Sequence, residues 1–404
     1  MQTRPKTAAL ALAMLLGAVL ATAPAYDARA ATRIRGVTIS NPIDGISEFR
    51  PRIAGNTVVW QRGTGPGAEV MRWTGTQTVN MSNNGVADEN PETDGIHIVW
   101  QQGTAPNRDI AVFDLVTGTT TILSSLGDET FPLISGPYLA WIKMVDADGE
   151  VFVDPGPIGD QVTGDLLVHS SFQMDGADVV WSQGDDLGQT PGTADDLNDI
   201  GVWNGALQGF FVLTGTGTDD IKPVAANGVV VWQAGPDGSG DIWYGDNVGT
   251  SSLLYDGVDE RNPHTDGTRV VWEHFDGLDF DLFLVNLASP NAAVPLTNDA
   301  FDDVTPQIDG NRIVWVKEVT PGDSEIWFSW DGAPPEPLRA TQNNGRDDVA
   351  PLLDGDRFVY ESCVDLDQPS EVCDIVLAPE PRGALLGAIA LVAMAALLAH
   401  DRRR

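Results

Sequence analysis

The chain of 404 residues is 42% hydrophobic and 20% charged, which supplies material for a large core and excludes wholesale disorder. It carries 23 Lys and Arg against 58 Asp and Glu, a formal net charge of −35. Nucleic acid is therefore a poor partner, because phosphate binding needs clustered cations. Cations, basic proteins and neutral glycans stay open as ligands.

The first 30 residues have the pattern of a secretory signal peptide. Arg4 and Lys6 precede an apolar run from Ala8 to Ala21, and Ala28-Arg29-Ala30 has the small residues of a cleavage site. We expect this segment to direct export and to be removed. A retained membrane anchor is the alternative.

An eightfold repeat fills residues 31–378. In each repeat an apolar run ends in an aromatic residue, and successive aromatics are 40 to 51 residues apart. A proline lies nine residues before the aromatic in seven repeats, and a glycine between the two marks a tight turn. We expect these aromatics to be core wedges between neighbouring units rather than a platform for glycans: Trp60, Trp100, Trp141, Trp181, Trp232, Trp272, Trp315 and Tyr360. Better candidates for glycan contact are Trp73, Trp203, Trp243, Trp327 and Trp330.

Each repeat is predicted to form four short strands, and a four-stranded unit of about forty residues is typical of one blade of a β-propeller. The fold class is therefore all-β, with eight four-stranded blades; seven blades plus a degenerate unit, or a long solenoid, are the alternatives. The last repeat ends at Ala378 after its third strand. Residues 37–40 align with the fourth strands of other repeats, so we expect this N-terminal strand to complete the last blade and remove an open sheet edge.

The segment Asn262-Pro263-His264-Thr265-Asp266-Gly267-Thr268-Arg269-Val270-Val271-Trp272 resembles the repeats of TolB-type β-propellers. The resemblance covers about residues 37–378 and implies the propeller fold. It implies little about function, because propellers carry many activities. The additional N-terminal domain of TolB has no counterpart in the sequence, so the scaffold role of TolB does not transfer.

Two series of acids recur with the aromatics. Three residues before the proline position stand Glu48, Asp88, Glu129, Asp220, Glu260, Asp303 and Asp348, with His169 in the fourth repeat. After the aromatic, an acid precedes an aliphatic residue in all eight repeats: Glu69, Asp109, Glu150, Asp199, Asp241, Asp281, Glu325 and Asp374. We expect both series on one face of the ring. They could fix the blade junctions by accepting backbone hydrogen bonds, hold calcium, or bind a basic partner.

Two clusters of acids are candidates for metal or ligand binding. The long loop of the fourth repeat contributes Asp185, Asp186, Asp195, Asp196 and Asp199, and the third repeat contributes Asp146, Asp148 and Glu150. Hard cations such as calcium prefer clustered carboxylate and carbonyl oxygens, although neither segment matches a twelve-residue EF-hand loop. The chain lacks a Gly-x-Ser-x-Gly elbow, a His-Glu-x-x-His helix motif and a P-loop, so no catalytic residue is predicted.

Cys363 and Cys373 are the chain's two cysteines. A disulfide is the default expectation in an exported protein, and a separation of ten residues suits a bridge across one hairpin of the closing blade.

The C-terminal segment 379–404 has three parts. Pro379-Glu380-Pro381 precedes an apolar run from Gly383 to Ala399, and Arg402, Arg403 and Arg404 end the chain. Seventeen helical residues reach roughly 26 Å, about enough to span a thin bilayer, with the arginines on the cytoplasmic side. The order resembles the PEP-CTERM sorting signal. That resemblance implies transient membrane anchoring, processing by an inner-membrane exosortase-type enzyme, and delivery to the outer surface or matrix of a Gram-negative bacterium. A plain tail anchor is the alternative.

These features predict an exported surface or matrix protein, a non-enzymatic propeller scaffold that binds a glycan or protein partner, with calcium as an optional aid. A polysaccharide lyase or glycoside hydrolase working at the acidic face, and a purely structural matrix component, are the two alternatives.

Overall fold

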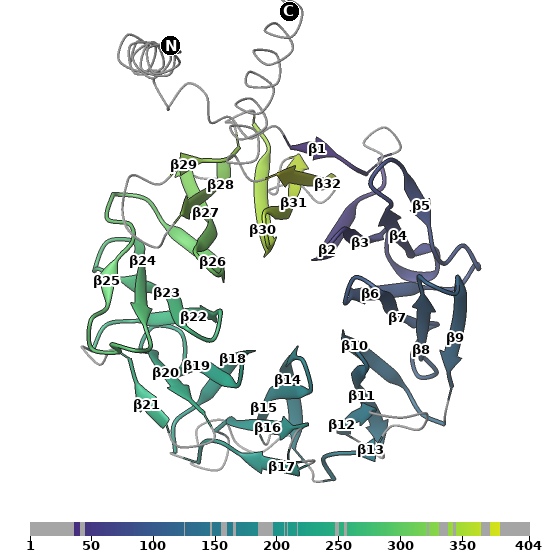
Figure 1. The fold of residues 1–404 in the computed structure, drawn as a ribbon, viewed down its shortest axis with the longest axis horizontal. Coiled ribbons are helices and arrows are strands. Elements are labelled where there is room, and N and C mark those ends of the chain that lie inside the picture. Colours follow the sequence, from purple (N-terminus) through teal and green to yellow (C-terminus); the bar gives the residue numbers. More distant parts are fainter. Residues whose placement is uncertain are drawn as a thin grey trace, which may run out of the picture. The chain divides into compact units, whose positions relative to one another are not determined.

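The computed structural model describes residues 36–379 apart from 41–44, 125, 146–147, 155–159, 165–166, 185–196, 206, 208, 216, 247–249, 254–256, 321–322, 331–337, 342–344 and 365–371. These residues form eight four-stranded antiparallel sheets arranged as the blades of a propeller ring (Figure 1). The predicted all-β class and eight blades are confirmed. Both terminal segments, 1–30 and 380–404, lie outside the described residues.

Each blade has four strands, A to D, from the central channel outward. The first four blades contain the strands β2 (Glu48–Ala54), β3 (Thr57–Arg62), β4 (Glu69–Trp73) and β5 (Thr78–Asn80); β6 (Asp88–Thr93), β7 (His97–Gln102), β8 (Asp109–Asp114) and β9 (Thr119–Leu123); β10 (Glu129–Ser135), β11 (Tyr138–Val145), β12 (Asp148–Asp154) and β13 (Asp160–Gln161); β14 (Val168–Asp175), β15 (Asp178–Gly184), β16 (Asp199–Asn204) and β17 (Gly209–Val212). A short 3-10 helix, η1 (Gly65–Gly67), lies between β3 and β4.

Blades 5 to 8 follow the same order. They contain β18 (Asp220–Ala226), β19 (Val229–Ala234), β20 (Asp241–Gly245) and β21 (Thr250–Ser252); β22 (Glu260–Thr265), β23 (Arg269–Phe275), β24 (Phe280–Asn286) and β25 (Val294–Pro295); β26 (Asp303–Asp309), β27 (Arg312–Thr320), β28 (Asp323–Trp330) and β29 (Leu338–Arg339); β30 (Asp347–Asp354), β31 (Arg357–Val364) and β32 (Val372–Pro379), which is completed by β1 (Val37–Thr38).

The ring closes through the two ends of the propeller, as the repeat pattern predicts. β1 pairs antiparallel with β32, with Val37 opposite Leu377 and Thr38 opposite Val376. The N–H of Ile39 also donates to the carbonyl of Ile375 at 2.9 Å. Strand D of blade 8 is therefore the first strand of the chain, beside the last one (Figure 1).

The core lies between the blades. Six tryptophans at the centre of the B strands are almost completely buried: Trp60, Trp100, Trp181, Trp232, Trp272 and Trp315. Trp141 and Tyr360, at the same position of blades 3 and 8, are also buried. Strands A and B meet at one face of the ring and B and C at the other. We call the face with the A–B and C–D turns the turn face, and the face with the B–C and D–A connections the loop face.

Candidate functional site

The acid at the start of strand A is buried, in agreement with the interpretation that these acids hold the ring together. Each of these acids opens or nearly opens strand A instead of lying in the preceding connection, and all seven are at most 3% exposed. In four blades the carboxylate accepts a hydrogen bond from the indole Nε1 of the core tryptophan: Trp100 to Asp88 at 2.7 Å, Trp232 to Asp220 at 3.1 Å, Trp272 to Glu260 at 3.2 Å and Trp315 to Asp303 at 2.6 Å. The acid and the aromatic recur together because the carboxylate accepts the hydrogen bond of the buried indole N–H.

Blade 4 shows what replaces this contact. His169 stands at the acid position and packs edge-on against Trp181, with ring centroids 6.1 Å apart. The Trp181 Nε1 donates instead to Gln183 Oε1 at 2.9 Å. In blades 1 and 3, the Nε1 atoms of Trp60 and Trp141 have no partner among the residues that the structure describes. The acid is therefore the common solution to a buried indole N–H, and the ring tolerates exceptions.

The acid at the start of strand C contacts strand D in six blades. A Ser or Thr hydroxyl just after strand D donates to the carboxylate and accepts the N–H of the residue that follows the acid. In blade 1, Ser82 Oγ lies 2.6 Å from Glu69 and 3.0 Å from the N of Val70. The same pair of bonds joins Thr163 to Glu150, Thr214 to Asp199, Thr297 to Asp281, Thr341 to Glu325 and Ser40 to Asp374.

A third series of acids joins neighbouring blades, and the sequence analysis missed it. The residue just before the strand-A acid accepts a hydrogen bond from the backbone N–H at or just before strand C of the preceding blade. The donors are Arg108 to Asp128 at 2.9 Å, Asn198 to Asp219 at 3.1 Å, Gly240 to Asp259 at 3.1 Å, Phe280 to Asp302 at 2.9 Å and Ser324 to Asp347 at 2.8 Å. The recurring pair of adjacent acids at these positions was the available signal.

The inner strands contain a second interblade contact without an obvious sequence signal. All eight A strands have a residue with a left-handed backbone at the same place, with φ from 50° to 55°: Arg50, Asn90, Phe131, Ser171, Lys222, Asn262, Thr305 and Ala350. The N–H of Asn90 donates to Gln61 Oε1 at 3.1 Å, and that of Thr305 to Glu273 Oε1 at 2.7 Å. Across the seam, Arg50 donates to Glu361 at 2.8 Å. The acceptor follows the core aromatic of the preceding blade.

Burial changes the protonation of several acids in these networks. It raises the pKa of Asp303 to about 6 against the opposing effect of Lys317, and it raises the pKa of Asp348 to about 6 as well. Asp303 bonds to Trp315 and Lys317 in its own blade, and Asp348 bonds to Ser362 of blade 8 and to Thr341 of blade 7. Burial is the largest cause of both shifts, and the negative charge of Glu325 on blade 7 also raises the pKa of Asp348.

The structure places the predicted binding residues as follows. Asp199 and Glu150 bond to Thr214 and Thr163 in the contact described above. Asp185, Asp186, Asp195, Asp196 and Asp146 lie outside the described residues, as does the side chain of Asp148, which opens β12. In the sequence, Asp185, Asp186, Asp195 and Asp196 fall between β15 and β16, and Asp146 falls between β11 and β12.

The outer tryptophans pack against the core. Trp73, Trp203, Trp243 and Trp327 are half-buried, and each contacts one of the hydrophobic clusters between blades. The side chain of Trp330 lies outside the described residues. Phe131 and Phe301 are more exposed, at 55% and 44%. Phe131 lies on the inner strand of blade 3 and Phe301 in the D–A connection of blade 7.

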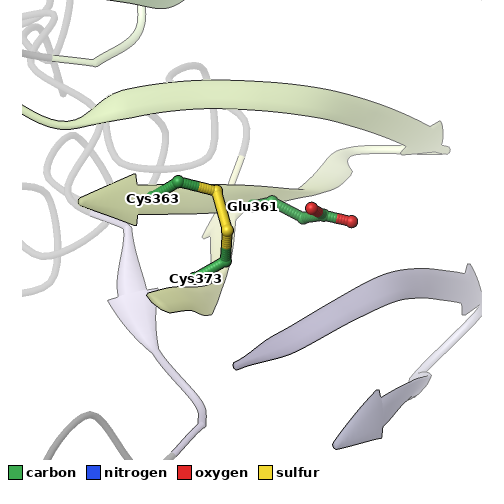
Figure 2. A group of neighbouring side chains, drawn as sticks. All are labelled: Glu361, Cys363 and Cys373. Carbon is green, nitrogen blue, oxygen red and sulfur yellow. A yellow bond between two sulfur atoms is a disulfide. The ribbon is translucent and has the colours of Figure 1, made fainter. Parts of the chain in front are cut away.

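The predicted disulfide is present. Cys363 and Cys373 are directly opposite each other on β31 and β32, and Figure 2 shows the bond between their sulfur atoms. With Glu361 they form the one group in the described part of the chain whose three potential ligand atoms lie within 4.8 Å of one another. Metal ligation by cysteine needs the thiolate, and both sulfurs are in the disulfide. Glu361 is moreover the acceptor of the Arg50 N–H, so this group closes the ring and is not a metal centre.

A small pocket lies between blades 4 and 5 on the turn face. Asp175, Asp178 and Asn204 line it together with apolar residues such as Val229 and Phe211. Its cavity volume of about 20 Å³ has room for about one water molecule. Asp175 accepts the backbone N–H of Asn227 in blade 5 and so joins the two blades, whereas Asp178 accepts the N–H of Gly205 within blade 4. No helix within the described residues is long and apolar enough to cross a membrane.

Comparison with known proteins extends the fold assignment. No protein-family model matches the chain, and no curated protein does. The β-propeller domain of the Trilobed protease from Pyrococcus furiosus, described as having an open velcro topology, matches with a TM-score of 0.50 and 13% identity over 74% of this chain and 99% of that one. Dipeptidyl peptidase 4 from Porphyromonas gingivalis matches with a TM-score of 0.57 and 11% identity over 86% of this chain and 60% of that one.

A putative TolB from Agrobacterium tumefaciens is also among the matches, with a TM-score of 0.35 and 14% identity over 55% of this chain and 84% of that one. Likeness at these identities concerns the fold alone, and the TolB score supports no argument beyond it. The chain also spans only 60% of the length of the dipeptidyl peptidase. Fold and contacts together define an eight-bladed β-propeller whose repeated acids hold the blades together.

Proposed function

We propose that the chain is an exported surface or matrix protein whose propeller is a non-enzymatic scaffold for a glycan or protein partner. One observation carries this proposal: the repeated carboxylates are bonded to indoles, hydroxyls and backbone N–H groups of the ring itself. A ring held in this way is a rigid platform, and the parts that break the repeat are left to determine the ligand.

The connection between β15 and β16 is the largest such departure. It spans fourteen residues, from 185 to 198, and includes Asp185, Asp186, Asp195 and Asp196 on the loop face. Clustered carboxylates suit calcium or a basic partner, and calcium bound there could in turn coordinate an acidic or hydroxylated glycan. The exposed Phe301 adds aromatic surface to the same face, and the exposed Phe131 adds it on the inner strand of blade 3.

The cellular localisation of the protein is part of this proposal. The pattern of residues 1–30 supports export, and the Pro379-Glu380-Pro381 segment supports processing by an exosortase-type enzyme. The last propeller strand ends at Pro379, so release after the motif would leave every described strand in the propeller.

Co-sedimentation with purified exopolysaccharide of the producing cells tests the binding role. Residues 31–379 would be mixed with the polymer in calcium chloride or in a chelator and pelleted. We expect calcium-dependent pelleting that D195N/D196N strongly weakens, because the asparagines keep a carbonyl oxygen but lose the two negative charges that favour calcium. The matched control D160N/D356N also removes two exposed acids and should pellet as the parent does. Absence of pelleting in both conditions would contradict glycan binding.

A further inference from the structure

The exit point of the chain determines which face of the ring a membrane can approach. Pro379 is exposed and ends β32 on the turn face, where it pairs with Arg357 just after the A–B turn of blade 8. Val37, which opens β1, lies opposite Leu377 at the same edge. Both ends of the propeller therefore leave blade 8 on the turn face.

The connection from this edge to the apolar run is very short. Three residues separate Pro379 from Gly383, where the apolar run begins, so the two residues are four Cα-to-Cα steps apart. Even fully extended, four residues reach only about 14 Å. A bilayer that holds residues 383–399 must therefore lie close to the turn-face edge of blade 8. The loop face is at the other end of the strands, so the ring itself separates it from that edge.

The charge of the turn face near the exit fits this placement. The residue after the A–B turn is an arginine in blades 6, 7 and 8: Arg269, Arg312 and Arg357. In the other five blades this position is Thr57, His97, Tyr138, Asp178 and Val229. With Asp266, Asp309, Asp354 and Asp356, the three turns have three cations against four anions. In a chain of net charge −35 these three turns have a net charge of only −1, so an anionic lipid surface repels them weakly.

We propose that the turn face of the propeller lies against the lipid bilayer while residues 383–399 tether the chain, and that the loop face points away from the membrane. This inference rests on the membrane anchoring included in the proposed function. It directs the loop-face end of blade 4, where β15 ends and β16 begins, away from the membrane, and blade 4 is opposite blade 8 in the ring (Figure 1).

Fluorescence quenching in vesicles tests this orientation with the full chain. Both native cysteines are in the disulfide, so one introduced cysteine can be labelled selectively without reductant. Asp356→Cys puts a fluorophore on the turn face of blade 8, where the side chain is 74% exposed. Leu278→Cys puts one on the loop face of blade 6, where the residue is 88% exposed. The vesicles would contain phosphatidylcholine, phosphatidylglycerol and a headgroup spin-labelled lipid.

We expect the label at position 356 to be quenched several-fold more strongly than the label at position 278. A twenty-residue Gly-Ser insertion after Pro381 should reduce that difference, because a long linker frees the ring. Equal quenching, or stronger quenching at position 278, would overturn the orientation while leaving anchoring intact. Flotation of the same samples separates the two failures: a chain that does not float with the vesicles has no tether, which would contradict the anchoring itself.

Discussion

Ser40 Oγ lies 3.3 Å from Asp374 Oδ1 and 3.0 Å from the backbone N of Ile375, although Ser40 and Asp374 are 334 residues apart. Ser82 makes the same pair of contacts with Glu69 and Val70 inside blade 1. The ring therefore closes with the contact that the other blades use internally, supplied by the opposite end of the chain.

Ser40→Ala should lower the free energy of unfolding by about 1–2 kcal/mol, because it removes the hydroxyl that donates to Asp374 and accepts the N–H of Ile375. Ser82→Ala is the matched control and should have a similar cost. The two variants should differ in amide hydrogen exchange: S40A should speed exchange in β1 and β32, and S82A should not. Equal exchange at the seam in both variants would mean that Ser40 does not hold it.

The partnership of Asp88 with Trp100 can be separated from metal binding. Asp88→Ala leaves a buried indole N–H without an acceptor and should cost about 1–3 kcal/mol in unfolding free energy. Asp88→Asn keeps an acceptor oxygen. Since burial raises the pKa of Asp88, loss of the charge should cost much less than loss of the oxygen. Urea unfolding of the two variants checks this. A similarly large loss of stability in both variants, together with stabilisation of the parent alone by added calcium, would favour a metal-binding role for this acid.

His264 should make stability depend on pH below neutrality. Burial lowers the pKa of His264 from 6.5 to about 4, although the negative charges of Asp266 and Asp309 act to raise it. The Nδ1 atom of His264 accepts the N–H of Ile308 at 3.2 Å. Because the folded state disfavours the proton, the stabilising contribution is complete above pH 6.5 and is lost as the pH falls toward 4. The loss is at most about 3 kcal/mol.

His264→Asn is the control for this effect, because its side-chain oxygen can replace the Nδ1 acceptor without titrating. Stability measured by urea unfolding from pH 7 to pH 4 should fall less steeply in H264N than in the parent. Identical slopes would show that other groups govern this range of pH.

The disulfide should stabilise the last blade. It closes a short loop between β31 and β32, and closing a loop of ten residues contributes about 2–3 kcal/mol in the chain-entropy model. Cys363→Ser should lower the melting temperature under oxidising conditions while the circular dichroism of the sheet is retained. The parent in reductant should show the same decrease. An unchanged melting temperature would count against a role for the disulfide in holding the seam.

The sequence predicted the blade count, the closing strand and the core aromatics, because each depends on a pattern that repeats with the fold. It did not predict that acids such as Asp88 are buried. Spacing places such an acid near a turn but does not show whether it belongs to the connection or to the first hydrogen-bonded pair of the strand. An acid that precedes a strand is usually exposed. A hydrogen bond to the indole explains the burial. That bond joins strands A and B, and the sequence alone does not give the register that brings the acid and the indole together.

The left-handed residues were beyond sequence reasoning for another reason. Phe131, Thr305 and Ala350 all have φ near 50°, which side chains of these types rarely adopt, and each precedes a proline that favours extended backbone before it. For Thr305, the hydrogen bond that its backbone N–H donates to Glu273 of the neighbouring blade helps to hold this conformation. A single repeat does not contain that acceptor, so local propensity could not reveal the conformation.

Because β1 pairs with β32, the ring can close only after the last propeller strand has been synthesised. β1 leaves the ribosome first and finds its partner only when the last propeller strand has been made. Any chain that stops before residue 372 leaves β1 unpaired and exposes the edge of β31. Such an edge invites pairing with other chains and attack by proteases. The seam thus distinguishes a finished molecule from a truncated one before the protein reaches its destination.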